Sequence, residues 1–196
     1  MLAMFALLFF QPDFGSAVII LGLWVGMVLI AGIPFRHLLT LAGAGLMVIV
    51  LLWTFAFADY QKERILSFIH PLADLQGAGY NAFQSTVAVG SGGILGKGIG
   101  YGTQSRLQFL PEHETDFIFA AYTEEFGLIG ALLLFGAYGI MFIRLSSITD
   151  HAINNFSRIF TLAFLLKLWI EMTINVGCNI GLLPITGIAL PFVSYG

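Results

Sequence analysis

The stretch from Ser16 to Ile33, SAVIILGLWVGMVLIAGI, contains no charged residue and indicates the fold class. A helix of this length rises about 27 Å, close to the ~30 Å hydrocarbon core of a bilayer. Three further apolar runs of similar length cover about Leu38 to Ala58, Ala120 to Ile143 and Ile159 to Val176. Since 58% of the chain is hydrophobic and only 10% is charged, these runs predict an all-α, polytopic bundle of transmembrane helices.

Basic residues in the short connectors indicate how these helices are oriented. Arg36 follows the first apolar run, and Arg144 and Arg158 bracket the polar connector between the last two runs. Two spans separate the two connectors, so both lie on the same side of the membrane, and basic residues in short connectors favour the cytoplasm. The segment from Asp59 to Asp116 is therefore predicted to be a long loop on the outer face.

The whole chain, residues 1–196, is predicted to be one membrane domain and a segment of a longer protein. Its apolar start lacks the basic region and the cleavage site of a signal peptide, and its last residue, Gly196, falls in what looks like a loop. The net charge of −3 and the lack of any Lys/Arg cluster exclude a nucleic-acid surface. A single cysteine, Cys178, excludes an intrachain disulfide.

The outer-face loop, residues 59–116, is far longer than an ordinary connection, which usually marks function. Its many glycines allow tight turns, and its scattered apolar side chains predict that it lies on the bilayer surface. Gln84, Ser85 and Gln104 supply neutral hydrogen-bonding groups within it. We interpret these three residues as candidates for substrate binding.

Asp116 is the candidate catalytic residue, because it lies where the polar loop meets a spanning helix. A carboxylate beside apolar residues at a membrane interface is partly desolvated, which strengthens it as a general base. The alternative is that Thr115 or Asp116 only caps the helix N-terminus. The sequence leaves both interpretations open.

The neighbouring residues Glu112-His113-Glu114 do not form a zinc-protease motif, because the second histidine would have to stand where Phe117 is. A divalent cation such as Mg²⁺ or Mn²⁺, held by the carboxylates of Glu112, Glu114 or Asp116, remains an open alternative. A solvated acidic rim is the other interpretation of Glu114.

The glycine-rich stretch around Lys97 is similar to a phosphate-binding P-loop, but the first glycine is replaced by Ser91 and the residue after the lysine is Gly98. This excludes an ATP site. Lys97 among glycine amides could still bind a pyrophosphate, and the alternative is a solvated loop lysine.

Charged residues inside the apolar runs are costly, so they usually face a polar cavity or a partner. Glu124 and Glu125 lie about two turns into the third run, where they are functional candidates; alternatively, one of them points inward into a hydrogen-bonded network. Lys167 and Glu171, spaced i and i+4, are predicted to form an internal ion pair.

The order and spacing of several motifs resemble the SEDS (shape, elongation, division, sporulation) family, and its elongation branch more than its division branch. The motifs are Gly79-Tyr80-Asn81-Ala82-Phe83-Gln84-Ser85, Gly96-Lys97-Gly98, Gly102-Thr103-Gln104-Ser105, Leu110-Pro111-Glu112 with Thr115-Asp116, Glu124-Glu125 with Gly127, and the segment from Gly181 to Gly196. The resemblance implies about ten spanning helices, of which this chain would hold five to six.

The resemblance also implies an activity. Members of the family are peptidoglycan glycosyltransferases that polymerise lipid II during cell-wall elongation, rod-shape maintenance and division, on the outer face of the bacterial cytoplasmic membrane, usually with a class B penicillin-binding protein. It makes Asp116 the catalytic residue, and we expect Lys97, Arg106, Glu112 and Glu124 to contribute to substrate binding. A fragment could be inactive by itself. The competing functions are a flippase for lipid-linked precursors and a non-enzymatic scaffold for a transpeptidase.

Overall fold

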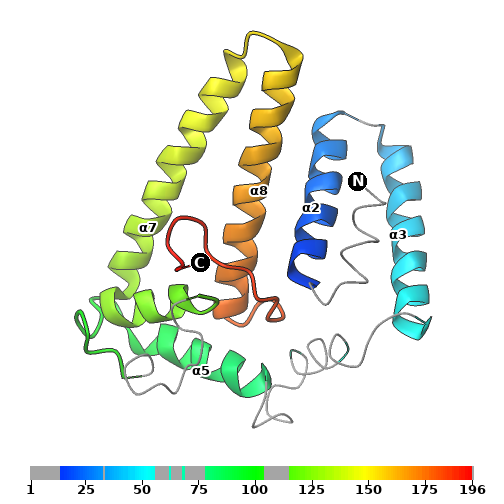
Figure 1. Ribbon diagram of the computed structural model, residues 1–196. Coiled ribbons are helices and arrows are strands. Elements are labelled where there is room, and N and C mark those ends of the chain that lie inside the picture. Colours follow the sequence, from blue (N-terminus) through cyan, green and yellow to red (C-terminus); the bar gives the residue numbers. More distant parts are fainter. Residues whose placement is uncertain are drawn as a thin grey trace.

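The computed structural model describes residues 14–32, 34–55, 62, 68, 78–103 and 115–195. Its elements are five helices, namely α2 (Phe14–Ile30), α3 (Phe35–Phe55), α5 (Ala78–Ser91), α7 (Ile118–Asp150) and α8 (Asn155–Asn179). No strand occurs in these ranges. The prediction of an all-α helical bundle is confirmed (Figure 1).

All four predicted apolar runs form helices. Among them, α7 with 33 residues and α8 with 25 residues are long and apolar enough to cross a membrane, and the apolar helix α2 is shorter. The predicted connector from Arg144 to Arg158 is wrong in its extent, because α7 continues to Asp150 and α8 begins at Asn155. Polar residues can extend a helix beyond the bilayer, and the side chain of Asn154 caps α8 by accepting from the Ser157 N–H at 2.7 Å.

The segment predicted as the outer-face loop, residues 59–116, contains a helix, because its residues 78–91 form α5. Glycine and β-branched residues gave this stretch a weak helical pattern. Packing supplies the stability that local propensity lacks, since Ser85 and Ala88 are fully buried and α5 contacts both α7 and α8. The boundaries of the outer-face loop, residues 59 and 116, stay a prediction.

Close packing of α2 against α8 depends on two glycines one turn apart. A Cβ at Gly22 would lie 3.3 Å from Ile170, and one at Gly26 would lie 3.1 Å from Leu166. The absent side chains let the two backbones approach closely, as small residues do in membrane helix pairs. This face of α2 is therefore occupied by the chain itself.

The segments that the sequence predicts to lie on the same side of the membrane are found at one end of the bundle. The start of α2, the end of α3, the start of α7 and the end of α8 all lie at the same end, where α5 runs across it (Figure 1). The two short connectors lie at the opposite end. The predicted parity of the connectors is confirmed.

A sharp kink divides α7 into a short first part and a long second part. Gly127 has φ 66° and ψ −163° inside the helix, which only glycine adopts readily. The first part lies across the bundle above α5, whereas the second part runs along α8 (Figure 1). Such a kink breaks the helical hydrogen bonds and leaves backbone groups in need of partners.

The glycine-rich loop after α5 supplies those partners. The N–H groups of Lys97 and Gly98 donate to the carbonyls of Glu124 and Glu125, both at 3.0 Å. Beyond the kink, the N–H groups of Leu128 and Ile129 donate to the carbonyls of Gly93 and Ile94, at 2.9 and 3.2 Å. The loop, residues 92–98, is thus joined into the break in α7 by four backbone hydrogen bonds.

Candidate functional site

Asp116 lies in a turn just before α7, and its backbone is held firmly. Its carbonyl accepts a hydrogen bond from the side-chain amide of Asn175 and another from that of Asn179, each at 3.0 Å. The preceding carbonyl, of Thr115, accepts from the Ser194 hydroxyl at 2.7 Å. The N-cap position of α7 falls on Phe117, which makes no side-chain cap. Thr115 and Asp116 therefore precede the N-cap, and capping by one of their side chains stays a prediction.

The carboxylate of Asp116 lies next to Gly187 in the segment that follows α8. A Cβ at Gly187 would lie 3.5 Å from Oδ2 of Asp116, and the glycine has φ 72°. Most side chains would be strained at this φ, and their Cβ would be in van der Waals contact with the carboxylate. The glycine therefore brings the backbone of this segment close to the Asp116 carboxylate.

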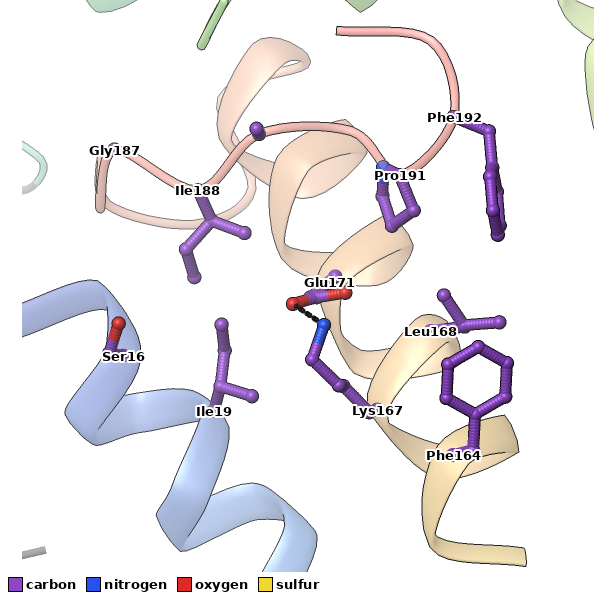
Figure 2. Close-up of a pocket in the computed structure, with 11 residues that line it drawn as sticks. Ser16, Ile19, Phe164, Lys167, Leu168, Glu171, Gly187, Ile188, Pro191 and Phe192 are labelled. Atoms are coloured by element: carbon purple, nitrogen blue, oxygen red, sulfur yellow. Dashed lines mark hydrogen bonds and ion pairs between the residues drawn. The ribbon is translucent and has the colours of Figure 1, made fainter. Parts of the chain in front are cut away.

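Gly187 also lines a cavity of about 480 Å³ between α2, α8 and the closing segment of the chain. Figure 2 shows the Lys167 ammonium and the Glu171 carboxylate meeting in it; the distance is 2.6 Å, and the predicted ion pair is confirmed. The other lining residues are mostly apolar, namely Ser16, Ile19, Phe164, Leu168, Ile188, Ala189, Pro191 and Phe192. A polar group inside such an apolar cavity suits an amphiphilic ligand.

Lys97 and Glu124, both predicted to bind substrate, instead contact each other. The ammonium of Lys97 lies 2.7 Å from Oε1 of Glu124, whose side chain is 0% exposed. The same oxygen accepts from the Thr103 N–H at 2.8 Å and from the Thr103 hydroxyl at 3.0 Å. Glu124 thereby fits the alternative of an inward network, whereas Glu125 accepts from the Gly100 N–H at 3.0 Å.

The other predicted substrate-binding residues have different positions. Ser85 is fully buried and donates to the backbone carbonyl of Asn179 at 2.9 Å, so its hydroxyl supports the fold. Gln84 lies beside it on α5 and is partly buried. Gln104, Arg106 and Glu112 lie outside the described residues. The substrate-binding roles stay predictions.

Three residues that hydrogen-bond to the Asp116 turn were not predicted from the sequence to do so. They are Asn175, Asn179 and Ser194. The available signal was the spacing, since two asparagines one turn apart in an apolar span must satisfy their amides internally. The partner could not be inferred, because it is a backbone carbonyl about sixty residues away.

Most of the predicted metal ligands lie outside the described residues. In the part of the chain that the structure describes, no three His, Cys, Asp or Glu side chains gather as a metal site would require. Glu112 and Glu114 lie outside that part, and of the predicted ligands only Asp116 lies within it. Binding of a divalent cation therefore stays a prediction.

Comparison with known proteins gives consistent similarities along the whole chain. The family model FtsW/RodA/SpoVE, described as cell cycle protein, matches residues 1–196. The peptidoglycan glycosyltransferase MrdB of Escherichia coli K12 is 38% identical over 190 residues, which are 95% of this chain and 50% of MrdB. A probable peptidoglycan glycosyltransferase FtsW from Thiomicrospira cyclica is 39% identical over 197 residues, 98% of this chain and 50% of that protein.

Two solved structures have the same fold. One is a chain from a study of how a peptidoglycan synthase complex coordinates polymerization and crosslinking, with a TM-score of 0.76, 32% identity and coverage of 97% of this chain and 52% of that one. The other is the rod shape-determining protein RodA of Thermus thermophilus, an aspartate-to-alanine mutant, with a TM-score of 0.59, 26% identity and coverage of 98% and 47%. The chain thus spans about half the length of the relatives it matches.

Proposed function

This chain belongs to the FtsW/RodA/SpoVE family of cell cycle proteins, and from that premise we propose that its protein is a peptidoglycan glycosyltransferase that polymerises lipid II. The observation that carries the proposal is the position of Asp116, whose turn is fixed by three side-chain hydrogen bonds and whose carboxylate lies beside Gly187. The relatives named peptidoglycan glycosyltransferase support the reaction class.

The family and the apolar helices make this a protein of the bacterial inner membrane. We propose further that the end bearing Asp116 and α5 is the outer face. The basic residues Arg36, Arg144 and Arg158 lie near the opposite connectors, and such residues favour the cytoplasmic side. Lipid II presents its sugars at the outer surface, so the proposed orientation brings them to Asp116.

In the proposed reaction, the Asp116 carboxylate accepts the proton of the GlcNAc 4-hydroxyl of one lipid-linked molecule. The hydroxyl oxygen attacks the anomeric carbon of MurNAc in the other molecule, and the new glycosidic bond forms with inversion. The bond from that carbon to the pyrophosphate oxygen breaks, and undecaprenyl pyrophosphate leaves with the electron pair. A firmly held carboxylate suits this role, since general-base catalysis depends on alignment.

The departing pyrophosphate carries negative charge, so it needs electrostatic stabilisation more than a proton. Arg106 and Lys97 are the proposed sources of positive charge. Lys97 already pairs with Glu124, although 28% of its side chain stays exposed. We therefore expect Lys97 to contribute less to pyrophosphate binding than an unpaired lysine would.

A class B penicillin-binding protein is the proposed partner. The support is a solved structure similar to this chain, which comes from a synthase complex that coordinates polymerization with crosslinking. The face of α2 that carries Gly22 and Gly26 does not suit such a partner, because it packs against α8. A scaffold that binds a transpeptidase through those glycines is thus disfavoured.

The deciding experiment compares full-length protein with the variant Asp116→Asn in a lipid II polymerisation assay in detergent or liposomes. The control is Asp150→Asn, the same chemical change at the other end of α7. We expect Asp116→Asn to lower the polymerisation rate about 10²- to 10⁴-fold and Asp150→Asn to leave it unchanged. Full activity of Asp116→Asn would refute the base, and a wild type that only moves lipid II between leaflets would identify a flippase.

A divalent cation is a further part of the proposal. Asp116 with Glu112 or Glu114 supplies the hard oxygen ligands that Mg²⁺ and Mn²⁺ prefer. Chelation with EDTA followed by addition of Mg²⁺ or Mn²⁺ tests this in the same assay. A rate that does not respond to chelation would remove the cation from the proposal.

A further inference from the structure

Two asparagines, Asn175 and Asn179, stand one turn apart near the end of α8. Their residues are 1% and 0% exposed, so the side-chain amides have no access to solvent. A buried amide needs internal partners, because leaving its groups unsatisfied costs free energy. Where these amides donate and accept therefore shows which segments they hold.

Both amides donate to the same acceptor. Nδ2 of Asn175 and Nδ2 of Asn179 each lie 3.0 Å from the carbonyl oxygen of Asp116. A carbonyl oxygen has two lone pairs, so these two donors fill its capacity and fix its direction. Asn175 also donates to the Ile188 carbonyl at 2.8 Å, one residue after Gly187.

Asn179 extends the connection to two other elements. Its Oδ1 accepts from the Ala120 N–H at 3.0 Å, which is one of the N–H groups at the start of α7 that lack a helical partner. The Ser85 hydroxyl on α5 donates to the backbone carbonyl of Asn179 at 2.9 Å and approaches Oδ1 at 3.3 Å. The Asn179 side chain thus joins the Asp116 turn to the first turn of α7.

We propose that Asn175 and Asn179 are positioning residues for the Asp116 carboxylate, acting through its backbone carbonyl. The inference rests on the proposed function, in which Asp116 is the general base. The two amides fix the Asp116 turn against Ile188 and Ala120, and so fix the position of the carboxylate beside Gly187. A displacement of about 1 Å at a reacting group can lower a rate about 10²-fold.

Ordinary helix packing is the competing explanation, since asparagine amides often join membrane helices. The two explanations differ in what a variant loses. Helix packing alone would lower stability and would disturb substrate binding and turnover together. Positioning lowers kcat while the KM for lipid II stays the same, because the substrate contacts themselves remain.

The test uses purified full-length protein with Asn175→Leu and Asn179→Leu, which keep the branched shape of the side chain and remove its hydrogen-bonding atoms. The control is Asn154→Asp at the far end of α8, where the side chain accepts from the Ser157 N–H and an aspartate would do the same. We expect kcat to fall about 10- to 100-fold in both leucine variants at unchanged KM, and to stay unchanged in the control.

A second measurement does not depend on activity. Hydrogen exchange at the Ala120 amide should accelerate at least about tenfold in Asn179→Leu, because that variant removes the acceptor of this N–H. Faster exchange with an unchanged kcat would overturn the positioning role. A lower kcat together with a higher KM and a lower thermal stability would overturn it in favour of plain helix packing.

Ser85→Ala keeps the inference testable if the leucine variants do not fold. This variant removes one hydroxyl donor to Asn179 but leaves both amides on Asp116. We expect kcat to fall about threefold at unchanged KM; a change in KM alone would instead support substrate binding by Ser85 and overturn the positioning network. An inactive wild type would refute the proposed function itself, whereas an active wild type with unaffected variants would refute only this inference.

Discussion

Two lysine–glutamate pairs in this chain have nearly the same length and very different surroundings. Lys97 and Glu124 lie 2.7 Å apart and join a loop to α7 across 27 residues of sequence, with the glutamate side chain 0% exposed. Lys167 and Glu171 lie 2.6 Å apart on one face of α8, with side chains 47% and 13% exposed at the edge of a cavity. The first pair connects two separate segments, whereas the second lies within a single helix.

The difference shows what each pair is able to do. Glu124 receives three further hydrogen bonds, from the Thr103 N–H, the Thr103 hydroxyl and the Ser91 hydroxyl, and its own carbonyl accepts from the Lys97 N–H beside the kink. Its charge is therefore part of the architecture that shapes the start of α7. Within the described residues, Lys167 and Glu171 form their ion pair inside one helix, and both side chains line the cavity.

The largest expected effect comes from breaking the first pair on one side. Lys97→Met removes the Lys97 ammonium from the buried Glu124 carboxylate, and losing one partner of a buried pair costs about 3 kcal/mol or more. The free energy of unfolding, measured by SDS titration in mixed micelles, should fall by that amount. A fall of under about 0.5 kcal/mol would show that the pair does not hold the loop.

The double variant Lys97→Met with Glu124→Leu separates the architectural role from substrate binding. Replacing a buried pair by apolar residues is often close to neutral, so we expect much of the lost stability to return, although Thr103 keeps unsatisfied donors. If polymerisation returns with stability, Lys97 is not needed for the pyrophosphate. Restored stability without activity would support the predicted contact between Lys97 and the leaving group.

The next effect tests how closely the loop approaches α7. A Cβ at Gly92 would lie 2.0 Å from the Thr123 carbonyl oxygen, whereas a Cβ at Gly93 would meet nothing within 4 Å, although Gly93 has φ 57°. Gly92→Ala should therefore destabilise by about 3 kcal/mol through overpacking, and Gly93→Ala by about 1 kcal/mol through backbone strain. Equal losses in the two variants would mean that the loop can withdraw from α7.

A smaller effect measures a single hydrogen bond to Glu124. Thr103→Val removes the hydroxyl that donates at 3.0 Å but keeps the backbone N–H that donates at 2.8 Å. A hydrogen bond to a charged group contributes about 1.5 kcal/mol or more, and the free energy of unfolding should fall accordingly. Thr161→Val is the matched control, because its hydroxyl bonds only to the Ser157 carbonyl of its own helix; an equal loss there would contradict the role of Thr103.

The sequence predicted the parts of the fold that depend on short-range patterns. Uninterrupted apolar runs gave the four long helices, and the i, i+4 spacing gave the pair of Lys167 and Glu171. It could not predict α5 or the kink at Gly127, because both depend on tertiary contacts. A weak local helix is stabilised by packing, and a kink is tolerated where a distant loop satisfies the freed backbone groups.

The candidate site was predicted in its chemistry and only partly in its structure. Asp116 was identified from its place between loop and helix and from the family resemblance, and its catalytic role stays a prediction. Lys97 and Glu124 were each interpreted alone, since no sequence rule indicates that residues 27 positions apart will pair. The support of the Asp116 carbonyl by Asn175 and Asn179 was missed for the same reason, because a backbone acceptor has no sequence signature.

The smallest effect is expected at the second ion pair, and it completes the comparison. The double variant Lys167→Met with Glu171→Leu replaces a pair that is partly exposed and bonded within one helix, so the free energy of unfolding should change by less than about 1 kcal/mol. A loss of 3 kcal/mol would show that this pair also supports the architecture. Because the pair lines the cavity that reaches Gly187 beside Asp116, a fall in lipid II polymerisation at unchanged stability would assign it to the substrate instead.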